Sequence, residues 1–279
     1  MNYKVLCDAP GQTCNRLWSY VASISECIVK NKSMVIIYFD YTIDDFPNLR
    51  YCSFIYFPLY FKWFLNTKNG WNKFKGLTWK ATHNEYLDKI YFSLGFIKGW
   101  HTRNDIKYIP EAKEELIKIF TPKKTIVNEA EKMFSIMREN ADIIVGIHVR
   151  RGDYATWNNG KYFYSLTQYH DFMKRVKKLY NDKKVVFFIS SNEKFSLSLF
   201  DDCTCYRHEN SSSVILDLYS LSLCDRIIGP ISTFSRWASF YGEKPLCFLT
   251  NANQEFSEDS FSKIVDYFHF ENGITIPDI

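Results

Sequence analysis

The sequence predicts an α/β protein built on parallel β-sheets. Short apolar runs rich in β-branched residues alternate with stretches in which apolar residues recur at helical spacing. In the clearest run, residues 143–149, a buried strand is expected to deliver a histidine, two arginines and an aspartate at its carboxyl end. Alternating strands and helices of this kind are typical of parallel sheets with right-handed crossovers.

A β-α-β unit is predicted at the start of the chain. Residues 4–7 form a short apolar strand, and a loop follows over residues 8–15. Apolar side chains then recur at helical spacing from Leu17 to Ile28, and residues 33–39 form a second apolar run. A strand, a helix and a second strand in this order are expected of a doubly wound sheet.

The rest of the chain continues this alternation after an irregular, aromatic and basic segment at residues 40–107, where we expect short helices and loops. Further helices are predicted at residues 111–120, 126–140, 166–180, from a cap at Ser212 or Ser213 to residue 223, and at residues 232–241 and 257–268. Further strands are predicted at residues 143–149, 184–190, 226–229 and 246–249. Pro122 marks the expected boundary between two domains, residues 1–122 and residues 123–279.

Polar side chains gather where the strand at residues 143–149 ends. Strand alternation turns the odd-numbered residues of this strand to one side and His148 with Arg150 to the other. Ligands bind outside the carboxyl ends of parallel strands, and the guanidiniums of Arg150 and Arg151 suit a planar acceptor such as phosphate or carboxylate. Asp153 is close enough in sequence to hold one arginine or His148. The alternative is a salt-bridge cluster at the surface.

A second candidate anion site lies at residues 232–235, which open a helix directly after a predicted strand. Backbone N–H groups, the helix dipole and hydroxyl groups are all available there to an anion. Simple N-capping by a serine or threonine is the alternative. Because both candidate sites belong to the same sheet edge, a diphosphate cradle is the better interpretation.

Missing motifs narrow the class of ligand. The sequence contains no G-x-x-x-x-G-K-(S/T), no G-x-G-x-x-G and no Asp-x-Asp pair. An enzyme without a metal must stabilise a leaving diphosphate with fixed cations, and paired arginines do this. The pattern therefore fits transfer from a nucleotide sugar, with no metal and no cofactor required.

Three segments also resemble a known family. Residues 148–153 read HVRRGD and resemble the His-x-Arg-Arg-x-Asp motif of the α-1,2-fucosyltransferases, glycosyltransferase family 11, and of their α-1,6- and protein-O-fucosyltransferase relatives. Residues 11–20 resemble the glycine-rich opening of that family, and residues 217–224 with 232–237 resemble its carboxyl-terminal motif. Two departures are Arg16, in place of glutamine, and Arg236, in place of a tryptophan; two glycines of the opening are also missing.

The resemblance implies a GT-B-like fold, in which two Rossmann-like domains flank a cleft. The carboxyl-terminal domain would bind the donor and the amino-terminal domain the acceptor. It implies an inverting, metal-independent transfer of L-fucose from GDP-fucose to a galactoside hydroxyl, in α-1,2 linkage, during synthesis of a surface polysaccharide or oligosaccharide. The rivals are a glycosyltransferase that uses another nucleotide sugar and a catalytically inactive module that binds a nucleotide or glycan.

The resemblance also implies roles for individual residues. Arg150 would bind the β-phosphate, Arg151 and Asp153 would shape the loop, and His148 would contact the nucleotide or support the loop. The other donor-binding candidates are Ser232, Thr233, Phe234 and Ser235 at the phosphates, Asp217 at the nucleoside, and Asn15 and Arg16 across the cleft. Asp8 and Asp153 are the candidates for the base that takes the acceptor proton.

Charge and composition bound the partners and the location. Residues 61–80 interleave tryptophan and phenylalanine with lysine, which suits an acceptor groove or a loose contact with an anionic membrane, whereas aromatic core residues with solvated lysines are the alternative. No nucleic-acid recognition motif is present, so nucleic acid is not expected as a partner. No signal peptide is visible, and we expect a cytoplasmic protein, at the inner face of the membrane if residues 61–80 bind there.

The cysteines are expected to be buried thiols, as is usual in a reducing compartment. Cys203 and Cys205 with His208 are the one cluster of residues with a metal-like pattern. The cluster has no second pair of ligands nearby in the sequence, so we expect no structural zinc there.

Overall fold

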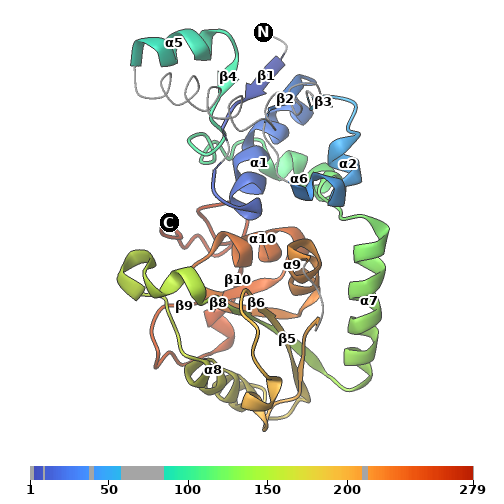
Figure 1. The fold of residues 1–279 in the computed structure, drawn as a ribbon, viewed down its shortest axis with the longest axis vertical. Coiled ribbons are helices and arrows are strands. Elements are labelled where there is room, and N and C mark those ends of the chain that lie inside the picture. Colours follow the sequence, from blue (N-terminus) through green and yellow to red (C-terminus); the bar gives the residue numbers. More distant parts are fainter. Residues whose placement is uncertain (1–2, 9, 38–40, 58–84, 209–212, 279) are drawn as a thin grey trace. The chain divides into compact units, whose positions relative to one another are not determined.

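The chain divides into two compact units, Met1–Lys123 and Lys124–Ile279, and each contains its own largely parallel sheet (Figure 1). The computed structural model describes residues 3–8, 10–37, 41–57, 85–208 and 213–278. The α/β fold class with parallel sheets, predicted from the sequence, is confirmed. Each unit is described by itself.

The sheet of the first unit has the strand order β3-β2-β1-β4, and all its strands are parallel. Its strands are β1 (Tyr3–Leu6), β2 (Ser33–Ile36), β3 (Ile55–Tyr56) and β4 (Phe96–Ile97). Its helices are α1 (Thr13–Val29), α2 (Pro47–Arg50), α5 (Glu85–Ser93) and α6 (Ile109–Ile119), with a 3₁₀ turn at Tyr41–Asp45. The predicted β-α-β start is confirmed. The strands β3 and β4 were missed because two residues are too few to show alternation.

The sheet of the second unit has the order β10-β9-β8-β5-β6-β7, parallel except for β10. Its strands are β5 (Ile143–Val149), β6 (Val185–Ser191), β7 (Cys205–Tyr206), β8 (Arg226–Pro230), β9 (Pro245–Leu249) and β10 (Ser262–Lys263). From β5 the chain builds outward through β6 and β7, then returns to place β8 on the other side of β5. The strand order therefore reverses between β5 and β8, which is where ligands bind in open α/β sheets.

Helices cover both faces of the second sheet (Figure 1). The odd-numbered residues of β5 share one side, as alternation predicted, and the helix α8 (Leu166–Leu179) packs on that side. The opposite face carries α7 (Lys124–Glu139), α9 (Val214–Leu223) and α10 (Thr233–Gly242). Gly146 allows the close approach of α9, because a Cβ atom there would lie 2.5 Å from Leu221 Cδ1 and 2.8 Å from Cys224 Sγ.

The predicted final helix at residues 257–268 is wrong. This segment instead forms a 3₁₀ turn at Glu258–Ser260 and the short antiparallel strand β10, followed by bends and isolated bridges. Its backbone N–H groups find acceptors outside a helix: Ser239 Oγ accepts from Ile264 N–H at 3.1 Å, and Asp266 Oδ1 accepts from Phe268 N–H at 2.7 Å. Tertiary contacts have overridden the helical pattern.

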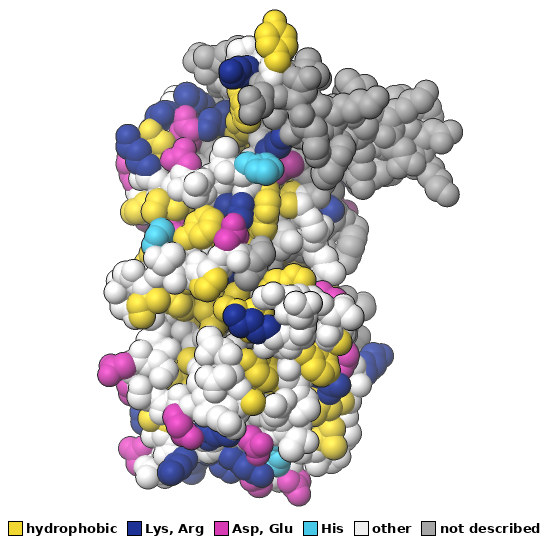
Figure 2. Space-filling model, turned by 90° about the vertical axis from the view of Figure 1, so that its left-hand side faces the viewer, with side chains coloured by type: hydrophobic (Ala, Val, Ile, Leu, Met, Phe, Trp, Pro, Cys, Tyr) yellow, Lys and Arg dark blue, Asp and Glu magenta, His cyan; other side chains and the backbone are white. Residues whose placement is uncertain are grey.

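The aromatic and basic segment at residues 61–80 lies outside the described residues. In the described ranges, none of the helices combines the length and the apolar character that crossing a bilayer requires. On the face drawn in Figure 2, the acidic and basic side chains of the described residues are interspersed.

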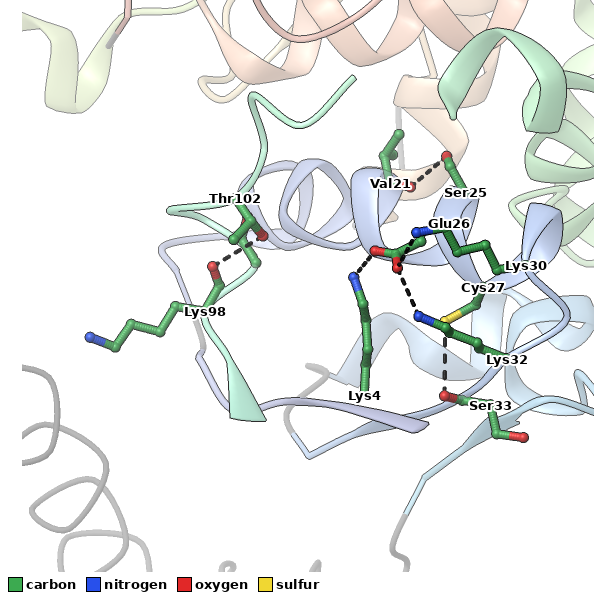
Figure 3. A network of polar contacts seen from close by, with 11 residues as sticks. Lys4, Val21, Ser25, Glu26, Cys27, Lys30, Lys32, Ser33, Lys98 and Thr102 are labelled. Carbon is green, nitrogen blue, oxygen red and sulfur yellow. Dashed lines mark hydrogen bonds and ion pairs between the residues drawn. The ribbon is translucent and has the colours of Figure 1, made fainter. Parts of the chain in front are cut away.

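A buried glutamate organises the first unit (Figure 3). Glu26 lies on α1 and accepts hydrogen bonds from Lys4 on β1, from Lys30 at 3.2 Å and from Lys32 at 3.1 Å. Burial alone would raise the pKa of Glu26, but the hydrogen bonds from Lys4 and Lys32 outweigh it and lower the pKa to about 2. One carboxylate thus joins α1 to the first strand and to the turn before β2.

Replacing this carboxylate should destabilise the protein. Because the pKa of Glu26 falls from 4.5 to about 2 on folding, its ionised form contributes stability above pH 4.5 that is lost as the pH falls to about 2. The variant Glu26→Gln should lose about 2–3 kcal/mol of unfolding free energy at pH 7. It should also show a flatter acid limb between about pH 4.5 and 2.

Thermal and urea unfolding of the full chain at several pH values measure this. The exposed Glu114, paired with Lys118 at 2.9 Å, supplies the control Glu114→Gln, which should change stability by under about 1 kcal/mol. Equal losses in the two variants would contradict a special role for Glu26.

Candidate active site

The reversal of strand order brings two segments together at the carboxyl ends of β5 and β8. His148 Nδ1 lies 2.7 Å from Ser235 Oγ, and both residues are buried. The imidazole also packs on the ring of Phe234, with centroids 4.8 Å apart. Burial, and then the charge of Arg150, lower the pKa of His148 to about 3. His148 is therefore neutral at pH 7 and supports α10 through its hydrogen bond.

A glycine makes room for this pair. Gly229 lies on β8, and a Cβ atom there would lie 2.8 Å from His148 Cβ and 3.0 Å from Ser235 Oγ. Any side chain at this position would push the two residues apart.

The arginine loop follows β5. Arg150 Nη2 lies 2.8 Å from Asp153 Oδ2, so the expected pairing of Asp153 with one arginine is confirmed. The Arg150 guanidinium lies over the ring of Tyr154, 5.5 Å from its centroid. The backbone N–H of Arg150 donates to the hydroxyl oxygen of Tyr169 on α8 at 3.2 Å. The guanidinium is thus held near the sheet edge while part of it stays exposed to solvent.

The other arginine contacts the neighbouring strand. Arg151 Nε lies 3.4 Å from Glu193 Oε2, and the Arg151 N–H donates to Asn192 Oδ1 at 3.1 Å. The sequence analysis missed Asn192 and Glu193. The rule that selected Arg150 would have found them, because they directly follow the end of β6, a strand parallel to β5.

The amino terminus of α10 forms the other half of the site. Ser232 Oγ accepts from Phe234 N–H at 3.2 Å, so Ser232 caps the helix. The Tyr154 hydroxyl donates to the carbonyl of Ile231 at 2.7 Å, and this bond ties the arginine loop to the residue before the cap. Ser232 and Ser235 both have protein partners, and the predicted contacts of an anion with Thr233 and with the backbone N–H groups of the first turn stay predictions.

Asp217 lies at the same edge of the sheet. It is on α9, and Ser190 Oγ donates to its Oδ2 at 3.4 Å. Ser190 is the residue of β6 that pairs with His148 of β5. Burial raises the pKa of Asp217 to about 7, against the opposing effects of Ser190 and of the Arg207 charge. The site therefore contains a carboxyl group that titrates near neutral pH.

Asp8, the candidate base in the first unit, follows the end of β1 and contacts the loop after β4. Asp8 accepts the N–H groups of Gly99 at 3.0 Å and Trp100 at 2.8 Å, one on each carboxylate oxygen. Burial raises its pKa, and the two backbone hydrogen bonds oppose the shift. Asp8 therefore has a structural part in holding the loop after β4.

Asn15 and Arg16 lie in the first turn of α1. Gly11 has a φ of +43°, and a Cβ atom there would lie 2.2 Å from Asn15 Nδ2, so glycine is needed for this close approach. The predicted placement of Asn15 and Arg16 across a cleft from the donor site stays a prediction.

Histidine, aspartate and cysteine also meet at one point of the second unit. Side-chain atoms of His170, Asp202 and Cys203 lie within 4.8 Å of one another. The carboxylate of Asp202 is already paired with His170 and with Lys174, so we assign no metal there. His208, which the sequence grouped with Cys203, instead bonds Ser220 Oγ at 2.8 Å.

Arg236, which departs from the family pattern, is fully buried in α10. Its Nη1 donates to the carbonyl of Tyr267 at 2.7 Å and its Nη2 to that of Pro277 at 2.5 Å. The guanidinium also lies over the Tyr267 ring, 4.5 Å from its centroid. Arg236 therefore holds the carboxyl-terminal segment against the helix rather than contacting a ligand.

The packing around His148 leads to a test. A methyl group at Gly229 should force His148 and Ser235 apart, so Gly229→Ala should lose about 1–3 kcal/mol of stability. It should also weaken anion binding at the sheet edge, because α10 would shift. The measurements are thermal unfolding and titration with GDP. The control is Glu114→Gln on the exposed surface of α6 in the first unit, which should leave the affinity for GDP unchanged. Unchanged GDP affinity in Gly229→Ala would contradict the proposed dependence.

Comparisons with known proteins concern the family and the fold. The family model described as Glycosyl transferase family 11 matches residues 69–271, whereas no curated protein sequence matches significantly. A mutant of Arabidopsis thaliana FUT1 in complex with GDP has 12% identity and a TM-score of 0.58, with 94% of this chain and 74% of that chain covered.

Two further solved structures are similar. Fucosyltransferase NodZ from Bradyrhizobium has 15% identity and a TM-score of 0.50, with coverage of 85% of this chain and 92% of that chain. POFUT1 in complex with GDP has 11% identity and a TM-score of 0.52, with coverage of 90% and 99%. At such identities the structures show a shared, GT-B-like fold, whereas the family model covers most of the sequence. The resemblance read from the motifs is confirmed: the chain belongs to glycosyltransferase family 11.

Proposed function

We propose that this glycosyltransferase moves L-fucose from GDP-fucose to a galactoside hydroxyl of a surface glycan, in α-1,2 linkage and with inversion. The observation that carries the proposal is the meeting of Arg150 and the amino terminus of α10 where the strand order reverses. A diphosphate placed there meets a guanidinium and a helix dipole at once. Membership of family 11 and the similarity to solved fucosyltransferases support fucose as the sugar.

The reaction would be a direct displacement. The acceptor oxygen bonds to C1 of fucose as the bond from C1 to the β-phosphate oxygen breaks, and GDP leaves with the electron pair. Arg150 would turn from Asp153 to the β-phosphate and stabilise the charge that develops, without a metal. We assign the proton of the acceptor hydroxyl to Asp153, which is exposed, in preference to Asp8, whose two oxygens already accept backbone N–H groups.

The remaining assignments follow the same division. The second unit would bind the donor, with Asp217 at the nucleoside and Thr233 at the phosphates, and the first unit would bind the acceptor. Residues 61–80 would contact the acceptor or an anionic membrane, and the cytoplasmic location stays a prediction. Liposome co-sedimentation at low salt tests the membrane contact.

The arginine assignment is tested by calorimetric titration with GDP, GDP-fucose and UDP in the presence of EDTA. The wild type should bind the two guanosine ligands and not UDP. In Arg150→Ala the affinity for GDP should fall by about 10- to 100-fold, because a charge-assisted hydrogen bond to phosphate is lost. Arg226→Ala is the control, since Arg226 pairs with Glu258 at the other end of β8. Unchanged GDP affinity in Arg150→Ala would sink the site assignment.

The main rival is a glycosyltransferase that uses another nucleotide sugar as its donor. This rival arises because Arg16 replaces the glutamine of the family opening and two glycines of that opening are missing. GDP-fucose and GDP-mannose turnover, measured side by side with galactoside acceptors, separates the two. Faster turnover of GDP-mannose would replace the fucose assignment. Tight GDP-fucose binding without turnover under any acceptor would favour the inactive binding module.

The buried carboxyl group predicts a pH dependence. If Asp217 accepts a hydrogen bond from the nucleoside, its ionised form is the one that binds. Because its pKa is about 7 in the ligand-free protein, the affinity for GDP should rise with pH through 7 and level off above about pH 8. Asp217→Asn should bind more weakly and lose this dependence. The Asp217→Asn variant also serves as the control for ionisation of the GDP phosphate, because that ionisation affects binding to the wild type and to the variant alike. Parallel pH profiles would rule out the contact.

A further inference from the structure

We propose that Glu193 is a positioning residue, which fixes Arg151 and the loop backbone so that Arg150 is the arginine of the pair that exchanges its partner for the donor diphosphate. The inference rests on the proposed function of this site. The two neighbouring arginines then have different roles: Arg150 binds the diphosphate, and Arg151 is held in place. The carboxylate that holds Arg151 lies outside the three segments that resemble the family motifs.

Glu193 contacts the arginine loop through both of its carboxylate oxygens. Its Oε1 accepts the N–H of Gly152 at 2.9 Å, and its Oε2 forms an ion pair with Arg151, 3.4 Å from Nε, without a hydrogen bond to that atom. The preceding residue adds a third contact, since Asn192 Oδ1 accepts the N–H of Arg151 at 3.1 Å. Two successive backbone N–H groups of the loop are therefore bound by the segment after β6.

The segment that carries Glu193 is itself fixed. The N–H of Glu193 donates to Ser191 Oγ at 3.1 Å, and its carbonyl accepts from Arg207 Nη2 at 3.4 Å. The fixed backbone keeps the carboxylate of Glu193 within reach of the loop.

The backbone of the loop requires this close contact. Gly152 has a φ of +41°, and a Cβ atom there would lie 2.8 Å from Asn192 Nδ2. A glycine thus permits both the left-handed conformation and the approach of the neighbouring segment.

The partner of Arg150 is of another kind. Asp153 is three residues away, its side chain is 57% exposed, and it accepts a hydrogen bond of 2.8 Å from the guanidinium. Exposed pairs of this kind are weak and exchange readily. The side chain of Glu193 is 37% exposed and is reinforced by its bond to Gly152. An incoming phosphate would therefore displace Asp153 from Arg150 before it displaced Glu193 from Arg151.

Amide hydrogen exchange in the ligand-free protein tests the contact itself, whatever the ligand. In Glu193→Ala the amide of Gly152 should exchange at least about tenfold faster than in the wild type. Glu193→Gln should keep most of the protection, because its amide oxygen can still accept from Gly152. Glu258→Gln, which breaks the comparable pair with Arg226, is the control and should leave Gly152 unchanged. Equal exchange of Gly152 in the wild type and in Glu193→Ala would overturn the proposal.

A double-mutant cycle on GDP affinity tests the division of labour. Glu193→Ala and Arg151→Ala should each weaken GDP binding by about tenfold, and the double variant by no more than the larger single loss, because both remove one contact. The losses of GDP affinity caused by Glu193→Ala and by Arg150→Ala should instead multiply in the double variant. Independent losses for Glu193 and Arg151 would overturn the proposal.

The pH profile of turnover separates positioning from proton transfer. Glu193→Gln should lower kcat/KM without moving the acid limb of the profile, whereas loss of a general base would flatten that limb. A flattened limb would contradict the positioning role. If the wild type binds no nucleotide, the proposed function falls and so does the part of Glu193 in donor binding, while the exchange data still decide whether it holds the loop.

Discussion

The hydrogen bond between the His148 imidazole and the Ser235 hydroxyl joins the two halves of the candidate site. It links the end of strand β5 to the first turn of α10 across 2.7 Å in a buried setting. In such surroundings a neutral, hydrogen-bonded pair is strongly favoured over separated polar groups. The contact joins the strand that leads into the arginine loop to the first turn of α10, and Gly229 provides the space for it.

The central strands could be read from the sequence because their physical cause is local. Residues 143–149 and 184–190 are continuous apolar runs, as strands buried on both faces must be. Their polar neighbours mark the carboxyl ends, and the rule for open sheets then gives the location of the site. The odd-numbered residues of β5 do face α8, and Ser213 and Ser232 do cap their helices.

The rest depends on contacts between distant segments. The stretch at residues 257–268 carries a helical pattern, yet β9, Ser239 and Arg236 take up its backbone groups. Asn192 and Glu193 follow the end of β6, so the strand-end rule could have selected them, but their contact with the arginine loop depends on the pairing of β6 with β5. Asp8 was a candidate base because it follows the end of a predicted strand. Its structural role appears only in the fold, where its carboxylate accepts two backbone N–H groups from the loop after β4.

Arg236 connects the carboxyl-terminal segment to α10. Its guanidinium binds the carbonyls of Tyr267 and Pro277, which lie on either side of the turn that reverses the chain. A tryptophan at this position would offer a single indole N–H and could not satisfy both carbonyls. In this chain residues 267–277 are therefore fastened to α10 by one buried side chain, so a change at residue 277 would be transmitted to the helix at whose amino terminus we propose that the diphosphate binds.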